Sequence, residues 1–272
     1  MKPVKKYILK AASAAFRTYN NGVRFLLFHE VKESQFRAFE SVIRFVKETY
    51  GFIAPGEYNH FSPMTGIRYI VSFDDGFISQ GEVTREVLNP LNIKAIFFVC
   101  PGFIGLQGKR AADFIRGPMA RSDVLQMRSE LQPLSWTDLT SLSSTGHVIG
   151  SHGMNHARLS ELKNESSLTE EIVTSGDELE MKLGRPIDWF AYPFGDIASI
   201  DSRSLGRVAK RYKYCCSGLR GINTETTHRL CLARENIDFN EHVDDLKRIA
   251  NGGLDQFYYF KRKTLFKMAE SC

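Results

Sequence analysis

The sequence contains little cysteine and no long apolar run. Its five cysteines are an odd number, and no two of them form a C-x-x-C pair. This pattern argues against a disulfide framework and favours reduced thiols in the cytoplasm. No apolar stretch approaches the ~18 residues that a membrane-spanning helix needs. We also expect no signal peptide, because Lys10 and Arg17 interrupt the alanine-rich segment near the start of the sequence.

The excess of positive charge is small, with a formal net charge of +5. Two interpretations of the basic ends stay open. They are solvated tails, or they attach the protein to the anionic inner face of a membrane, with residues 3–19 lying on the surface as an amphipathic helix. Nucleic-acid binding is disfavoured, because it needs a contiguous basic face with stacking aromatics. The terminal basic residues are Lys2, Lys5, Lys6, Lys10, Lys261, Arg262, Lys263 and Lys267.

The chain otherwise has the composition of one soluble α/β domain. Of its 272 residues, 43% are apolar and 25% are charged. Short apolar runs alternate with helical stretches, which favours parallel strands joined by helical crossovers. We predict a distorted (β/α)7-type barrel over residues 23–258, between a basic N-terminal segment (1–22) and a basic C-terminal tail (259–272). The expected strands are 23–28, 69–73, 95–99, 148–150, 189–193, 214–217 and 230–237, and the expected helices are 34–50, 82–88, 167–183, 202–212 and 241–250.

Residues 101–134 break this alternation. A connection of this length inside a compact domain is usually functional or mobile. We predict a loop insertion over the active-site face, with a short helix near residues 120–130. The residues that interrupt regular structure here are Gly102, Gly105, Gly108, Gly117, Pro118 and Pro133.

Carboxylates and imidazoles follow two of the expected strands. Asp74 and Asp75 come directly after one apolar run, and His152 and His156 follow another. In barrels of this kind, catalytic groups lie at the carboxyl ends of the strands. One carboxylate and two imidazoles make a divalent-metal site with open positions, and the other carboxylate can then act as a base on water. Either motif alone would be weak, but together they predict a metal-dependent hydrolase.

These segments resemble the motifs of polysaccharide deacetylases that share the NodB homology domain. Residues 71–76, VSFDDG, are similar to the T-F-D-D-G motif, and residues 151–156, SHGMNH, are similar to H-[ST]-x-x-x-H. Residues 190–195, FAYPFG, stand where the third motif, R-x-P-[YF], would fall. The resemblance covers residues 23–250. It implies a NodB-like deacetylase barrel, similar to carbohydrate esterase family 4, that removes the N-acetyl group from an acetamido sugar.

The resemblance also implies individual roles. Asp75, His152 and His156 would bind the metal, for which we expect zinc, with cobalt, nickel or manganese as alternatives. Asp74 would be the general base for a metal-bound water. A backbone N–H near Tyr192, Pro193 and Phe194 would hold the oxyanion together with the metal.

Two positions depart from the common family pattern. The third motif has Ala191 where the family usually has the arginine that orients the base. Arg234, on the last expected strand, could supply that charge, or it could make a structural ion pair. The usual C-terminal L-x-H motif is not evident, but residues 27–31, LFHEV, are similar to the branch that deacetylates exported poly-N-acetylglucosamine. In that branch the corresponding strand comes first, which implies that His29 is the general acid; a histidine that merely ends a strand is the alternative.

The leading hypothesis is therefore a metal-dependent carbohydrate N-deacetylase. Its cytoplasmic character suggests an acetylated glycan intermediate, lipid-linked or nucleotide-linked, as the substrate. The alternative is a non-catalytic carbohydrate-binding or scaffold protein on a degenerate deacetylase barrel. The missing arginine at position 191 and the unconventional acid favour that alternative.

Overall fold

The centre of the molecule is a parallel sheet. The computed structural model describes residues 20–59, 65–119 and 131–272. Within them, seven strands pair in the order β6-β5-β4-β3-β2-β1-β7, and each pairing is parallel. The strands are β1 (Gly22–Phe28), β2 (Ile67–Asp75), β3 (Ala95–Val99), β4 (Val148–Ser151), β5 (Trp189–Ala191), β6 (Tyr214–Cys216) and β7 (Arg234–Asn236).

The sheet curls into a half-barrel whose two edges meet at a seam between β6 and β7. An isolated parallel bridge joins Cys216 to Leu232, just before β7 begins. The amide of Arg234 donates to the carbonyl of Leu219 at 3.0 Å. These contacts nearly close the barrel, and they confirm the expected distorted (β/α)7 architecture.

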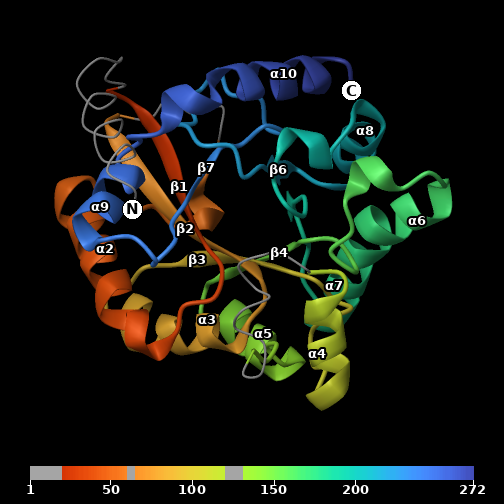
Figure 1. The fold of residues 1–272 in the computed structure, drawn as a ribbon, viewed down its shortest axis with the longest axis horizontal. Helices are drawn as coiled ribbons and strands as arrows, with labels where there is room; N and C mark the ends of the chain where they lie inside the picture. The colour runs from red at the N-terminus through yellow and green to blue at the C-terminus, as the bar shows by residue number, and fades with distance from the viewer. Residues whose placement is uncertain (1–19, 60–64, 120–130) are drawn as a thin grey trace.

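Helices surround the strands, as Figure 1 shows. They are α2 (Phe36–Thr49), α3 (Ile78–Val83), α4 (Gly108–Arg116), α5 (Trp136–Ser144), α6 (Glu165–Thr169), α7 (Ser175–Leu183), α8 (Ser202–Arg211), α9 (Val243–Ala250) and α10 (Tyr259–Glu270). Between α6 and α7 the chain forms a π-helical turn, η6 (Glu170–Thr174), so residues 165–183 make one helical run. Among the described residues, no helix is long and apolar enough to cross a membrane.

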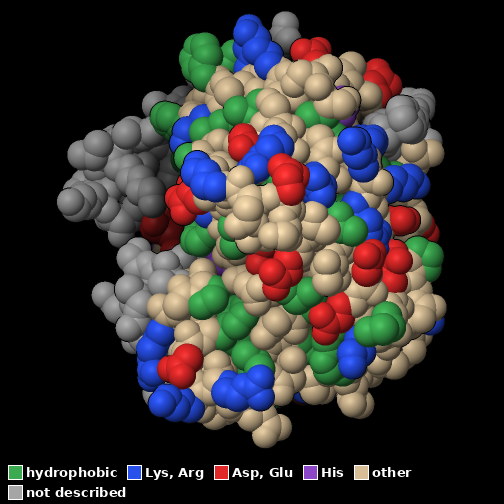
Figure 2. Space-filling model, turned by 90° about the vertical axis from the view of Figure 1, so that its right-hand side faces the viewer, with side chains coloured by type: hydrophobic (Ala, Val, Ile, Leu, Met, Phe, Trp, Pro, Cys, Tyr) green, Lys and Arg blue, Asp and Glu red, His purple; other side chains and the backbone are tan. Residues whose placement is uncertain are grey.

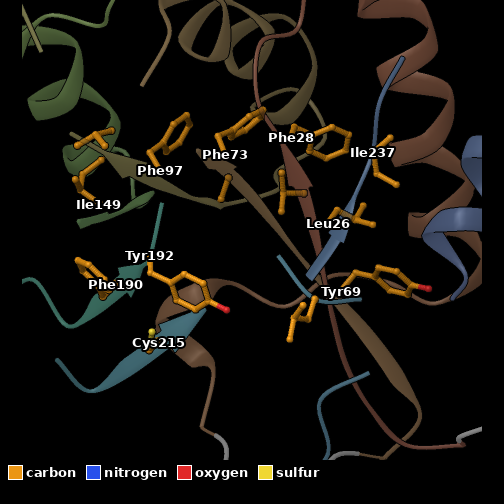
Figure 3. Close-up of a cluster of buried hydrophobic side chains, with 14 of the residues drawn as sticks. Leu26, Phe28, Tyr69, Phe73, Phe97, Ile149, Phe190, Tyr192, Cys215 and Ile237 are labelled. Atoms are coloured by element: carbon orange, nitrogen blue, oxygen red, sulfur yellow. The ribbon is translucent and has the colours of Figure 1, made fainter. Parts of the chain in front are cut away.

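Alternation along the strands divides the core into two layers. On β3, Ile96 and Phe98 face the inside of the barrel, where they join Phe25 and Trp189. The intervening Phe97 belongs to the larger cluster between the sheet and the helices. Figure 3 shows part of this outer cluster. A strand buried on both faces is expected to be apolar throughout, as this one is.

The largest differences from the sequence-based expectations are in three segments. The 101–134 insertion contains α4 over Gly108–Arg116, while the helix expected near 120–130 lies outside the described residues. The last strand covers only Arg234–Asn236 of the expected 230–237. Residues 259–270, expected as part of a basic tail, form α10, because Leu265 and Ala269, one helical turn apart, are buried against the domain.

The face that carries α6 and α8 has no dominant charge. Figure 2 shows basic and acidic side chains interspersed on it. Arg203 and Arg207 of α8 both pair with Glu165, at 3.1 and 2.5 Å. Arg211 pairs with Asp177 at 3.0 Å. The three arginines of α8 are thus each paired with a neighbouring acid.

Candidate active site

Strand β2 ends in two carboxylates that point in different directions. The alternation that turns Ile70 toward the inside of the barrel does the same for Asp74. Asp75 has a φ of 80° and Gly76 a φ of 88°, so the chain turns sharply at this point. A left-handed φ costs a non-glycine residue about 1–3 kcal/mol, which surrounding contacts must offset. At Gly76 a Cβ would also lie 3.0 Å from the side chain of Ile104, so a larger residue would be both strained and crowded here.

The two histidines follow β4, and the backbone fixes the tautomer of each. His152 Nδ1 lies 2.6 Å from the carbonyl oxygen of Ala191, and His156 Nδ1 lies 3.2 Å from that of Pro118. Because a carbonyl only accepts, both Nδ1 atoms must donate. The lone pair of each ring is therefore on Nε2. This second hydrogen bond is the usual support of a metal-binding histidine.

The free Nε2 atoms converge on Asp75. His156 Nε2 lies 3.4 Å from Asp75 Oδ1, and His152 Nε2 lies 3.6 Å from the same oxygen. Ligand atoms at 2.0–2.2 Å from a tetrahedral metal stand about 3.4 Å apart. Asp75 Oδ1 and His156 Nε2 are buried with no hydrogen-bond partner among the described residues. Such orphaned, converging acceptors fit a divalent metal ion, and the three residues form a candidate metal group by distance.

The protonation states of these groups also suit a metal. Burial lowers the pKa of His152 to about 4, against the opposing charge of Asp74, so the ring is neutral near pH 7. Burial would raise the pKa of Asp75, but His156, His29 and His152 together outweigh it, and the pKa is lowered. Metal ligands must be deprotonated, and both groups meet this requirement.

Asp74 lies beside the metal group and is held by an arginine. Arg234 Nη1 and Nη2 donate to Asp74 Oδ1 and Oδ2 at 2.6 and 2.8 Å, and Arg234 Nε donates to the carbonyl of Ser217 at 2.8 Å. Burial alone would raise the pKa of Asp74, but Arg234 and His152 lower it. The structure therefore presents an ionised carboxylate, oriented by a bidentate contact, next to a site for a metal.

A family model for polysaccharide deacetylases matches residues 63–214, which is more than half of the chain. The chain belongs to the polysaccharide deacetylase family. The matched residues include Asp74 and the three candidate metal ligands, whereas His29 and Arg234 lie outside them. No curated protein matches the chain.

Solved structures of deacetylases share the fold. IcaB from Ammonifex degensii is similar with a TM-score of 0.66 and 18% identity, over 86% of this chain and 97% of that one. The Streptococcus pyogenes deacetylase PplD gives 0.64 and 20%, over 85% and 99%. The polysaccharide deacetylase BC0361 from Bacillus cereus gives 0.64 and 19%, over 87% and 71%. At these identities the likeness establishes the fold of this deacetylase-family chain.

The residues at the third family motif contact the site through the histidines. The side chain of Tyr192 lies in the hydrophobic core (Figure 3), where its hydroxyl donates to the carbonyl of Gly195 at 3.1 Å. The ring of Phe194 packs against His156, with centroids 4.8 Å apart. Pro193 has no N–H, so a backbone donor to an oxyanion would have to come from Tyr192 or Phe194. Phe194 is thus beside the candidate metal ligands, and the Tyr192 phenol is not.

His29 follows β1 at the same edge of the barrel. It is half-buried, and its positive charge, when protonated, lowers the pKa of both Asp74 and Asp75. Its backbone is fixed by Gln80, whose Nε2 donates to the carbonyl oxygens of both His29 and Asp74. Gln80 thereby ties the ends of β1 and β2 together. No sequence pattern singles out Gln80 for this role.

Glu171 is a second residue that the sequence analysis missed. It is 4% exposed, and its carboxylate accepts hydrogen bonds from the backbone amides of Asn155 and Ala157, which flank His156. The helical period of the sequence could have indicated this residue, because Glu171 falls on the buried face of its helix, with Leu168 and Ser175. A carboxylate on such a face usually has a specific partner.

Proposed function

We propose that the protein is a metal-dependent carbohydrate N-deacetylase that removes an N-acetyl group from an acetamido sugar of a glycan. The observation that carries this proposal is the convergence of Asp75, His152 and His156, with the ionised Asp74 next to them. Family membership supports the acetylated carbohydrate as the substrate class. The neutral imidazoles and single carboxylate favour zinc, with cobalt, nickel or manganese as alternatives.

Each residue has a distinct part in this proposal. A divalent cation held by Asp75, His152 and His156 would polarise the amide carbonyl and lower the pKa of a water molecule. Asp74 would accept the proton of the attacking water, because Arg234 keeps it ionised and oriented. His29 would donate a proton to the departing nitrogen, and the amide of Tyr192 or Phe194 would donate to the developing oxyanion.

A non-catalytic protein on a degenerate barrel is the alternative. Its main argument is Ala191, which leaves the third motif without an arginine. In the structure, Arg234 contacts both oxygens of Asp74 from strand β7. The carboxylate therefore has a guanidinium partner, although the cation comes from another strand. This contact favours the enzyme.

We further propose that the protein acts in the cytoplasm, at the inner face of the membrane, on a lipid-linked or nucleotide-linked glycan intermediate. The support is a surface formed by Phe257, Tyr259, Phe260, Lys261 and Lys263, called here the aromatic–basic surface. Its three aromatic residues are 54%, 53% and 80% exposed, and both lysines are exposed. Aromatic rings beside lysines suit the headgroup region of an anionic bilayer.

The direct test is release of acetate from an N-acetylated oligosaccharide by the purified protein, with and without added zinc. We expect activity with zinc and about one metal ion per chain. His152→Ala and His156→Ala should lose both the metal and the activity. Asp74→Asn should keep the metal and lose activity by a factor of about 10²–10⁴, the usual contribution of a general base.

The variants show which part of the proposal is wrong if the expected results are not obtained. Wild-type turnover by Asp74→Asn would show that the base is assigned wrongly. Unchanged metal content in both histidine variants would show that the metal site is wrong. Stoichiometric metal without hydrolysis of any acetylated glycan would favour the non-catalytic alternative.

A further inference from the structure

The loop that carries the metal-binding histidines has an unusual backbone. His156 has a φ of 60° and Gly153 a φ of 80°, both in the left-handed region. Glycine adopts this region freely, but histidine does so at a cost of about 1–3 kcal/mol. Some contact must therefore hold the backbone around His156 in place.

That contact comes from Glu171. Its Oε1 accepts a hydrogen bond from the amide of Asn155 at 2.9 Å, and its Oε2 accepts from the amides of Asn155 and Ala157 at 3.2 and 3.3 Å. These two amides stand on either side of His156. One buried carboxylate thus binds the backbone immediately before and after a predicted metal ligand. Hydrogen bonds to an ionised acceptor are stronger than those between neutral groups.

The same helical run holds the beginning of the loop. Ser175, one turn after Glu171, lies with its hydroxyl 2.8 Å from that of Ser151, which in turn accepts from the amide of Gly153 at 3.3 Å. A Cβ at Gly153 would lie 2.6 Å from Glu171 Oε2, so the carboxylate occupies the space of the missing side chain. The carboxylate of Glu171 therefore packs directly against the backbone of the loop at Gly153.

The π-helical turn η6 contains Glu171 and is anchored from its other side. Tyr212, beyond α8, donates from its hydroxyl to the carbonyl of Ile172 at 2.6 Å. A π-helical turn shifts the side chains that follow it relative to a regular helix, and such turns are frequent at functional sites. Here the turn lies at the contact between the helix and the loop.

We propose that Glu171 is a positioning residue for the metal site, which acts by holding the backbone of His156 in its left-handed conformation so that Nε2 faces Asp75 Oδ1. The proposal rests on the metal site of the proposed function. It predicts that loss of the second acceptor oxygen weakens metal binding without unfolding the protein. Outer contacts of this kind change metal affinity by factors of about 10–100.

The test compares Glu171→Gln with Glu170→Gln. The glutamine at 171 keeps the size of the side chain but replaces one acceptor oxygen by an NH₂ group, which cannot accept from an amide. Glu170 is the matched control, because it is exposed on the same helical turn and, among the described residues, its carboxylate accepts only from the side chain of Asn155, at 3.5 Å. Zinc affinity is measured by chelator competition. Visible absorption of the cobalt-substituted protein reports the geometry of the metal site, and thermal unfolding of the metal-free protein reports the stability of the fold.

We expect Glu171→Gln to bind zinc about 10–100-fold more weakly, to show an altered cobalt spectrum, and to melt near the wild-type temperature without metal. Glu170→Gln should match the wild type in all three. Zinc affinity of Glu171→Gln within twofold of the wild type would overturn the proposal. So would a variant that fails to fold, since Glu171 would then support the whole domain. A wild-type protein that binds none of zinc, cobalt, nickel and manganese would refute the proposed function instead.

Discussion

Arg234 binds both carboxylate oxygens of Asp74, at 2.6 and 2.8 Å, from a position 160 residues away in the sequence. Arg234 is fully buried and Asp74 is 3% exposed. The pair is therefore shielded from solvent on both sides. Removing one member leaves the other as an uncompensated buried charge, which is far more costly than removing both.

This asymmetry gives the first prediction. Arg234→Met should lower the free energy of unfolding by about 3–5 kcal/mol, because Asp74 is left buried without its cation. The double variant Asp74→Asn/Arg234→Met should recover part of that loss. Urea unfolding of the wild type, Asp74→Asn, Arg234→Met and the double variant measures the coupling free energy between the two side chains. If Arg234→Met changed the free energy of unfolding equally in the wild type and in Asp74→Asn, the pair would not stabilise the fold.

The second prediction concerns His29 as the general acid. An amine must be protonated as it leaves, whereas 4-nitrophenolate leaves without a proton. His29→Asn should therefore lower kcat on an N-acetylated glycan by a factor of about 10²–10⁴ and affect the hydrolysis of 4-nitrophenyl acetate far less. A parallel loss on both substrates would assign His29 to binding or structure. Metal content, measured alongside, should stay at the wild-type level.

The third prediction is a pH dependence of stability due to His147. Its Nδ1 accepts from the amide of Ala95 at 3.1 Å, and its Nε2 is 3.0 Å from Asn89 Oδ1, so the buried ring is neutral. Burial lowers the pKa of His147 from 6.5 to about 4. Since the unfolded chain binds this proton more readily, His147 contributes its full stability above pH 6.5 and loses it as the pH falls toward 4.

Comparison with His147→Gln isolates this contribution from other acid-sensitive groups, including His152. Urea midpoints at pH 7.5, 5.5 and 4.5 should fall less steeply in the variant than in the wild type. Parallel curves for the two proteins would contradict the prediction.

The fourth prediction tests the aromatic–basic surface. The protein should sediment with vesicles that contain phosphatidylglycerol, more weakly with pure phosphatidylcholine vesicles, and less at high salt. Phe257→Ser/Phe260→Ser should weaken this binding, because it removes the apolar contact. Met181→Ser is the control, since Met181 is 74% exposed on another helix. Equal binding by both variants would show that this surface does not attach to the membrane.

The metal group could be predicted from sequence because its residues lie at strand ends. Parallel strands bring their carboxyl ends to one edge, so Asp75 and His152 are expected to be neighbours even without known distances. Arg234 could be named only as one option, since its orientation depends on the register of β7. That register pairs Arg234 with Phe25, in the middle of β1, and the long side chain then reaches Asp74 from inside the barrel.

Other features depend on contacts that no local pattern specifies. The sequence places Glu171 in a helix but does not indicate its partners, because these are backbone amides of a loop rather than side chains. The segment that forms α10 resembles a basic tail in sequence, because its lysines conceal the short apolar stripe of Leu265 and Ala269. In both cases tertiary packing decides the outcome, and the composition of the segment does not reveal it.

The seam of the barrel ties the candidate active site to the completion of the fold. Arg234 joins the two edges through its amide, bonded to Leu219, and through its Nε, bonded to Ser217. Its remaining nitrogens hold Asp74. Since β7 is the last of the described strands, a chain shortened before residue 230 would keep the three candidate metal ligands and lack the cation that pairs with Asp74. In such a fragment, no guanidinium from β7 would hold Asp74 ionised and oriented.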